Sequence, residues 1–158
     1  MSGGVAAPAV TPDRETFRRL ARRHRVVPVW RTLLADLTTP VAAFVRLCGD
    51  DESGGPGFLL ESVDHGGRWS RWSFVGRAPR AKLVARHGRV TVTGDLPDGI
   101  VGEDGVLSTL ERLLEHYRAP VAADFGAEGA SLPPLHSGVV GYLGYDVVRE
   151  VEHLPGTP

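Results

Sequence analysis

The stretch Phe58–Gly76, FLLESVDHGGRWSRWSFVG, contains the residue types in this chain that are best suited to binding a small polar molecule. An apolar run ends in the carboxylate of Glu61 and the hydroxyl of Ser62, and a glycine turn leads to a segment where Arg71 lies beside aromatic residues. A carboxylate could pair with an ammonium group, a hydroxyl could hydrogen-bond to a second polar group, and Arg71 could receive a carboxylate. An amino acid with an apolar side chain would suit these three groups. The alternative interpretation is a strand end that emerges into solvent.

Other kinds of chemistry find little support in the sequence. The six histidines are scattered, and none lies four residues from another, so the ligand spacings typical of a zinc site are absent. Cys48 falls on the apolar stripe of an expected helix, which indicates a small buried residue rather than a nucleophile. Gly138, Gly141 and Gly144 recur every three residues, but no tight G-x-G turn opens a helix, so they form no dinucleotide fingerprint.

Composition narrows the class of protein. The chain has 158 residues, 42% of them hydrophobic, which is enough for one domain with a core. Eighteen Lys and Arg residues against 19 Asp and Glu residues leave a net charge of -1, which argues against a dedicated nucleic-acid-binding protein. One cysteine excludes an internal disulfide, and no apolar run approaches the roughly 20 residues that a membrane helix needs. We therefore expect a cytoplasmic α+β domain, preceded by a disordered leader over residues 1–10 that lacks a secretory signal.

Three helices are expected, over residues 11–25, 38–50 and 105–118. In the first, Thr11 is the expected cap and Pro12 the first helical residue, and Phe17, Leu20, Ala21 and His24 form one face. The second has Thr39 as cap, Pro40 in its first turn and Gly49 at its end. In the third, Leu107, Leu110, Leu114 and Tyr117 share one side. The arginines of the first helix could bind phosphate groups, but a solvated helix face is the favoured interpretation.

The remaining segments predict strands and loops. Residues 26–34 are β-branched and aromatic, typical of a strand, and residues 81–94 predict a hairpin that turns at His87–Gly88. A long loop is expected over residues 119–138, then a strand that runs into a short helix capped by Asp146. Several strands are apolar on both faces and need a layer on each side, which indicates a missing half.

Four segments together resemble a known family. VVPVWRTLLADLTTPVAAFVRL, FLLESVD, RWSFVGR and GVVGYLGYDVVREVEHLP resemble, in this order, the N-terminal region of anthranilate synthase component I. The resemblance runs from about Thr11 to Pro155, and the LLES box with the following SRWSFVG is its most specific part. The lead-in VPVWRTLLAD and the segment TPVAAF favour this family over the aminodeoxychorismate and isochorismate synthases.

The resemblance implies a function that the residues alone do not show. Enzymes of this family are lyases that convert chorismate to anthranilate and pyruvate, with Mg²⁺ and with ammonia from a glutamine amidotransferase, component II. The chorismate- and magnesium-binding residues lie in a C-terminal half that has no counterpart here, so no catalytic residue is carried over and the fragment alone is expected to be inactive. The N-terminal region holds the pocket for feedback inhibition by L-tryptophan, to which Ser62, Glu61 and Arg71 correspond.

The same resemblance implies the fold and the domain limits. The expected fold is α+β, the N-terminal part of a two-sheet β-sandwich with flanking helices, incomplete without a C-terminal half. Its limits are residues 11–155, with residues 156–158 as the start of a linker. Two further readings stay open: an aminodeoxychorismate synthase component I fragment, and a free-standing amino-acid-binding regulatory module that acts on a partner chain. Nucleic-acid binding by the basic helix is a more distant alternative.

Overall fold

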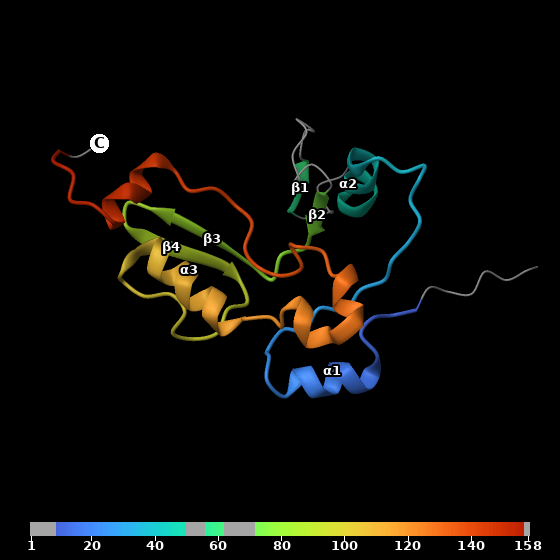
Figure 1. Ribbon diagram of the computed structural model, residues 1–158. Helices are drawn as coiled ribbons and strands as arrows, with labels where there is room; N and C mark the ends of the chain where they lie inside the picture. The colour runs from blue at the N-terminus through green and yellow to red at the C-terminus, as the bar shows by residue number, and fades with distance from the viewer. Residues whose placement is uncertain (1–8, 50–55, 62–71, 157–158) are drawn as a thin grey trace, which may run out of the picture. The chain divides into compact units, whose positions relative to one another are not determined.

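A computed structural model describes residues 9–49, 56–61 and 72–156 of the chain (Figure 1). It contains helices and two small antiparallel sheets, so the α+β prediction is confirmed. The chain divides into two compact units, one formed by residues 1–36 with 113–139 and the other by residues 37–112 with 140–158. The predicted leader and linker fall mainly on residues 1–8 and 157–158, which lie outside the described residues.

Helix α1 of the first unit spans Arg14–Ala21. Its N-cap is Asp13, whose carboxylate accepts a hydrogen bond from the backbone N–H of Thr16 at 2.7 Å. The predicted cap, Thr11, is wrong because Thr11 is extended and exchanges two backbone hydrogen bonds with Trp30, of 2.9 and 2.7 Å. That pairing is an isolated bridge, so the strand predicted over residues 26–34 is also wrong.

Only part of the predicted apolar face of α1 is buried. Leu20 is buried, whereas Phe17 is exposed and the helix ends before His24. The His24 ring instead lies within 3.2 Å (Nδ1 to O) of the carbonyl of Arg118.

A 3₁₀ segment, η2 (Ala122–Ser131), occupies much of the region predicted as a long loop. It is kinked at Gly126, whose φ of 61° is a left-handed conformation that glycine adopts without strain. Buried Phe125 meets the Trp30 ring edge-on with centroids 5.2 Å apart, and the Trp30 indole N–H donates to Ser131 Oγ at 3.2 Å. These two contacts explain why the segment is ordered although its composition is that of a loop.

Helix α2 (Pro40–Cys48) belongs to the second unit and confirms its prediction closely. Thr39 accepts a hydrogen bond from the N–H of Ala42 at 3.1 Å, Pro40 opens the helix, and Gly49 ends it with a φ of 75°.

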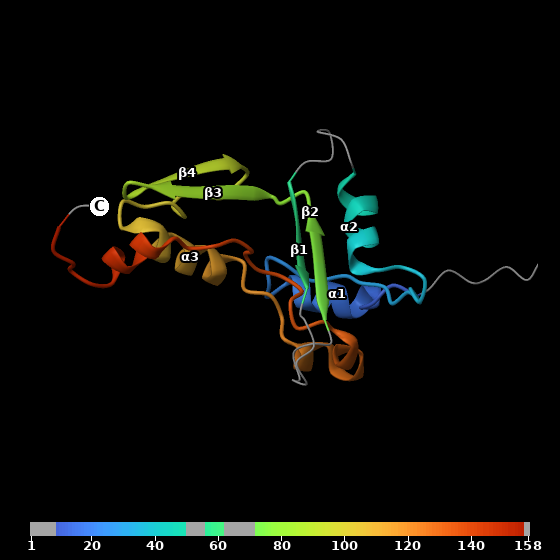
Figure 2. The same ribbon diagram turned by 90° about the horizontal axis from the view of Figure 1, so that it is seen from above.

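Strands β1 (Gly57–Glu61) and β2 (Ser73–Arg77) pair antiparallel, as predicted, with Gly57 opposite Arg77 and Glu61 opposite Ser73. Helix α2 lies along this hairpin in both ribbon views (Figure 2). At Gly57 there is no room for a side chain, because a Cβ would overlap Cys48 Sγ. The close approach of helix to strand therefore depends on glycine at this position.

The predicted hairpin forms from β3 (Ala81–Arg86) and β4 (Arg89–Gly94). His87 and Gly88 both have positive φ, of 52° and 71°, as a two-residue turn of this hand requires. The β-sandwich itself stays a prediction, since each described sheet has two strands.

Helix α3 (Gly105–His116) forms where it was predicted, but with a different buried side. Thr109 is 0% exposed and Leu113 is buried, while Leu114, predicted to face inward, is 52% exposed. Thr109 can be fully buried because its hydroxyl donates to the carbonyl of Gly105 at 2.8 Å, which satisfies the polar group inside the helix.

The C-terminal part ends in the 3₁₀ segment η3 (Tyr145–Glu150). Residues 139–144 form no strand within the described part of the chain, and Tyr142 is 95% exposed, so the predicted strand is wrong here. A strand needs a neighbour for its backbone groups, and none of the described strands pairs with this segment. Asp146 lies inside η3 rather than at its cap, and its carboxylate is 3.6 Å from the Arg149 guanidinium.

No helix in the described ranges is long and apolar enough to cross a membrane.

Candidate functional site

The end of the β1–β2 hairpin that leads into residues 62–71 carries the first residue of the predicted amino-acid site. Glu61 is the last residue of β1, lies opposite Ser73, and is exposed. Ser62 and Arg71 lie outside the described residues, so the meeting of these three side chains stays a prediction.

One face of the hairpin presents an aromatic surface beside this end. Phe58 lies opposite Gly76, where a Cβ would overlap the Phe58 ring, and Leu60 lies opposite Phe74. Trp72 stacks on Phe74 with ring centroids 6.3 Å apart and planes 16° apart. Leu60 and Trp72 are 44% and 42% exposed, so this face offers open apolar surface to an aromatic ligand.

Glu61 belongs to the opposite face. Side chains alternate along a strand, so Glu61 shares its face with Gly57 and Leu59, and helix α2 meets that face at Gly57 through Cys48. A ligand lying on the aromatic face would therefore contact Leu60 and Trp72 before it reached the Glu61 carboxylate. Sequence reasoning placed Glu61 and the aromatic residues around one pocket and did not consider this separation.

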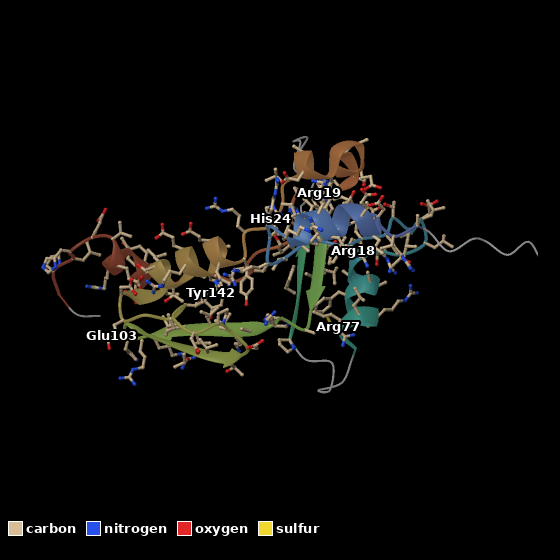
Figure 3. The ribbon with its side chains drawn as sticks, turned by 90° about the horizontal axis from the view of Figure 1, so that it is seen from below. Arg18, Arg19, His24, Arg77, Glu103 and Tyr142 are labelled. Atoms are coloured by element: carbon tan, nitrogen blue, oxygen red, sulfur yellow. The ribbon has the colours of Figure 1, made fainter. Side chains whose placement is uncertain are left out.

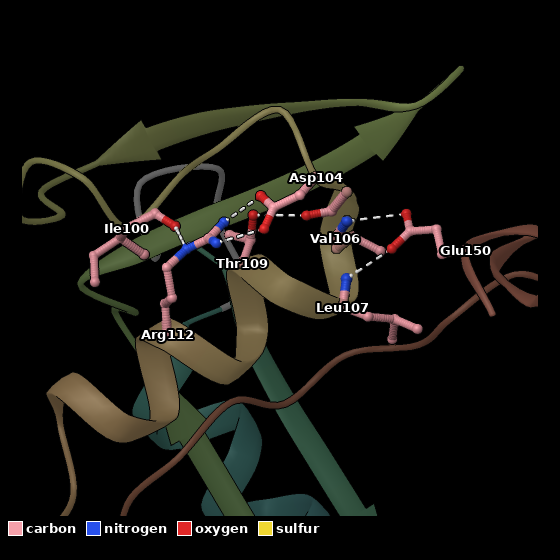
Figure 4. Close-up of polar contacts among 8 residues, drawn as sticks. Ile100, Asp104, Val106, Leu107, Thr109, Arg112 and Glu150 are labelled. Atoms are coloured by element: carbon pink, nitrogen blue, oxygen red, sulfur yellow. Dashed lines mark hydrogen bonds and ion pairs between the residues drawn. The ribbon is translucent and has the colours of Figure 1, made fainter.

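A second polar cluster lies at the start of α3 (Figure 4). The Arg112 guanidinium donates two hydrogen bonds of 2.7 Å to the Asp104 carboxylate, and its Nε donates to the carbonyl of Ile100 at 2.8 Å. The hydrogen bond from Arg112 holds the pKa of Asp104 at about 2, and the same pair raises the pKa of Arg112. Because both charges are paired, the cluster has no free acid or base for proton transfer, and its role is structural.

Glu150 completes this cluster from the far end of the chain. Its two carboxylate oxygens accept hydrogen bonds from the backbone N–H groups of Val106 and Leu107, each at 2.9 Å (Figure 4). These are first-turn donors with no carbonyl partner inside the helix, and a carboxylate there also lies at the positive end of the helix dipole. Asp104 precedes α3 and has the residue type of a cap, but its carboxylate binds Arg112, which leaves the role to Glu150. Sequence reasoning missed all three residues, and no local pattern connects Glu150 with a helix more than 30 positions earlier.

The end of α1 carries a basic groove in the first unit. The groove has a volume of about 740 Å³. Its lining residues are Phe17, Ala21, Arg22, Arg23, His24, Arg25, Val26 and Val27. Figure 3 shows the neighbouring Arg18 and Arg19 side chains projecting from the same helix. Because a carbonyl oxygen only accepts hydrogen bonds, the contact to Arg118 requires the proton on Nδ1 of His24 and leaves Nε2 for another partner.

No metal site is found in the part of the chain that the structure describes. No group of three or more His, Cys, Asp or Glu side chains there could hold a metal ion. The resemblance places the ligands of the expected Mg²⁺ outside this chain, so the Mg²⁺ stays a prediction.

Comparison with known proteins gives a consistent set of relatives. No model of a known protein family matches the chain. The chain is 42% identical over 151 residues to anthranilate synthase component 1 of Mycolicibacterium smegmatis, covering 95% of this chain and 27% of that protein. It is 41% identical over 150 residues to anthranilate synthase component 1 of Streptomyces coelicolor, covering 95% of this chain and 24% of that protein. The protein of that name in Thermus thermophilus is 39% identical over 132 residues, or 84% of this chain and 25% of its own length.

These matches confirm the resemblance to the N-terminal region of anthranilate synthase component I. The chain spans about a quarter of the length of the curated relatives that it matches.

Proposed function

We propose that this chain is the N-terminal part of an anthranilate synthase component I, the lyase of the first step of tryptophan biosynthesis. The whole protein would convert chorismate and ammonia to anthranilate and pyruvate. The observation that carries this proposal is the similarity of 36–44% identity over 93–95% of the chain to several proteins of that name. Similarity along nearly the whole chain supports a shared domain rather than a shared short motif.

The partners and cofactor belong to the same proposal. Ammonia would come from a glutamine amidotransferase, component II, and chorismate and Mg²⁺ would bind residues outside this chain. The protein would work in the cytoplasm. On its own this chain would be inactive, because the resemblance places the chorismate- and magnesium-binding residues in a C-terminal half outside it.

Within that protein, the β1–β2 hairpin would supply part of an inhibitory L-tryptophan site. In the sequence, Ser62 directly follows Glu61 and Arg71 directly precedes Trp72, and Leu60, Trp72 and Phe74 form an apolar face of the hairpin. An indole could lie against that face while the polar groups bind the ammonium and carboxylate of the amino acid. Glu61 would contact the amino acid from the end of β1, because its side chain belongs to the other face of the hairpin, which α2 covers.

Inhibition requires that tryptophan bind one conformation of the enzyme better than another, since only differential affinity shifts a conformational equilibrium. The hairpin meets this condition if its ligand also touches the catalytic part. Replacing Ser62 should therefore change the tryptophan sensitivity more than the turnover.

The test is an assay of the full-length protein, encoded by the reading frame continued past Pro158. Chorismate and ammonia are supplied in the presence of Mg²⁺, with and without tryptophan, and the anthranilate formed is followed by its fluorescence. Formation of aminodeoxychorismate instead, or an absent catalytic continuation of the frame, would refute the proposed activity.

The site assignment is tested with Ser62→Ala and Ser62→Leu. Loss of one neutral hydrogen bond of about 0.5–1.5 kcal/mol should raise the tryptophan concentration for half inhibition about two- to tenfold in Ser62→Ala. The bulkier Ser62→Leu should raise it further by steric exclusion. Thr93→Leu, which replaces an exposed hydroxyl on the β3–β4 hairpin, is the matched control. Unchanged inhibition of Ser62→Leu would show that the site lies elsewhere.

A further inference from the structure

The contact between α2 and the β1–β2 hairpin centres on one buried side chain. Cys48 is 7% exposed, its Sγ lies where a Cβ of Gly57 would be, and its thiol is 3.9 Å from the carbonyl oxygen of Gly76. The same Cβ would lie 3.4 Å from the Phe44 ring. Helix α2 packs against both strands, and at Gly57 it meets the face of the hairpin to which Glu61 belongs.

Space, and not backbone conformation, requires glycine at position 57. The φ of Gly57 lies outside the left-handed region, in contrast to those of Gly49 and Gly94. An alanine could therefore adopt this backbone conformation, but its methyl group would push against the Cys48 thiol. The size of one side chain thus sets how closely α2 approaches β1.

The position of the hairpin depends on this contact. An isolated two-stranded hairpin is marginally stable in water, and packing against a helix is one way to stabilise it. Within residues 9–49, 56–61 and 72–156, β1 and β2 pair with each other and with no other strand. A movement of α2 at Gly57 would therefore tilt the paired strands as far as Glu61, about 13 Å away at about 3.3 Å per residue.

We propose that Cys48 and Gly57 are positioning residues for the inhibitory amino-acid site, and that α2 holds the hairpin in its ligand-binding position. This inference rests on the proposed function and concerns the regulation of that site. Neither residue would touch the ligand. Their contact sets the fraction of molecules in which the Glu61 end of the hairpin is placed to bind, and the apparent dissociation constant rises as that fraction falls.

The experiment compares four variants of the full-length protein with the wild type. Gly57→Ala places a methyl group against the thiol, Cys48→Ala removes the thiol, and the third variant combines both changes. The matched control is Gly94→Ala at the end of β4, where a Cβ would overlap the carbonyl of Arg80 and strain the other hairpin.

Four quantities are measured for each protein. They are the tryptophan concentration for half inhibition, kcat and KM for chorismate, the melting temperature, and amide hydrogen exchange over β1 and β2. A purely structural role would change the melting temperature without separating inhibition from turnover.

Gly57→Ala should raise the tryptophan concentration for half inhibition about three- to tenfold and accelerate exchange over β1 and β2, while kcat and KM stay within about twofold. Cys48→Ala inserts no atom and should raise the half-inhibition concentration about two- to threefold, because it loosens the same contact. The double variant should resemble Cys48→Ala, since the thiol is one of the two atoms closest to the new methyl group. Gly94→Ala should lower the melting temperature and leave tryptophan inhibition unchanged.

The inference is overturned if Gly57→Ala and Cys48→Ala are inhibited like the wild type, or if kcat/KM for chorismate falls as much as inhibition weakens. Equal weakening of inhibition in Gly94→Ala, or full additivity in the double variant, would overturn it as well. If Gly57→Ala does not fold, Cys48→Ala alone decides by the same criteria. All these outcomes leave anthranilate formation by the wild type intact, whereas its absence would refute the proposed function and the inference with it.

Discussion

Glu150 provides the sharpest test of how the C-terminal segment is held to α3. Its carboxylate accepts hydrogen bonds from the Val106 and Leu107 N–H groups, and both groups lack any partner within the helix. Glu150→Gln keeps the shape but loses the charge and one acceptor oxygen, whereas Glu150→Ala loses both hydrogen bonds. Both substitutions should expose the first turn of α3 to local opening.

The size of the effect follows from the geometry. Loss of a helix cap costs about 0.5–2 kcal/mol, and two hydrogen bonds of 2.9 Å to a carboxylate belong to the stronger kind. Glu150 is exposed, so water replaces part of what is lost. We expect about 1 kcal/mol for Glu150→Gln and about 1–2 kcal/mol for Glu150→Ala. Since about 1.4 kcal/mol is a tenfold change in an equilibrium constant, amide exchange should accelerate about fivefold and about five- to thirtyfold, respectively.

Hydrogen exchange of the full-length protein, read at the amides of Val106 and Leu107, measures this opening directly. Glu152→Gln is the control, because Glu152 is exposed and lies on the same segment outside the cluster. The reasoning is refuted if Glu150→Ala leaves exchange at these two amides unchanged, or if Glu152→Gln accelerates it equally.

Two further predictions concern pairs that the structure brings into contact. The Arg112 hydrogen bonds hold the pKa of Asp104 at about 2, below its ordinary value of 3.8, so the stabilisation is complete above about pH 4 and is lost as the pH falls toward 2. The melting temperature of the wild type should therefore drop more between pH 4 and pH 2 than that of Asp104→Asn, and parallel curves would contradict the pairing. Gly76→Ala would place a Cβ into the Phe58 ring and should destabilise the protein by about 1–3 kcal/mol, whereas Gly141→Ala, with open space around it, should stay within about 0.5 kcal/mol. Equal thermal stability of the two alanine variants would show that Phe58 moves aside without cost.

The candidate inhibitor site was predictable from the sequence only in part. The apolar run that ends at Glu61 and the aromatic segment around Trp72 and Phe74 correctly predicted a hairpin. The sequence pattern does not specify the pairing register of the two strands. That register places Leu60 opposite Phe74 and puts Glu61 on the face that α2 covers. A one-residue shift of register would reverse these faces, and no local signal in the sequence specifies it.

The sequence by itself determined the elements whose signals lie within a few residues of one another. Thr39, Pro40 and Gly49 specify helix α2 from both ends, and His87–Gly88 specifies the β3–β4 turn. These residues meet the hydrogen-bonding and backbone-conformation needs of the helix ends and the turn locally, so distant contacts do not alter these elements.

Only the tertiary structure decided the features in which one local signal competes with a distant partner. Thr11 pairs with Trp30, and Asp13 caps α1 instead. Asp104 binds Arg112, and Glu150 caps the start of α3 instead. In each case the backbone donors at the helix start must find an acceptor, and the three-dimensional arrangement selects which one lies within reach.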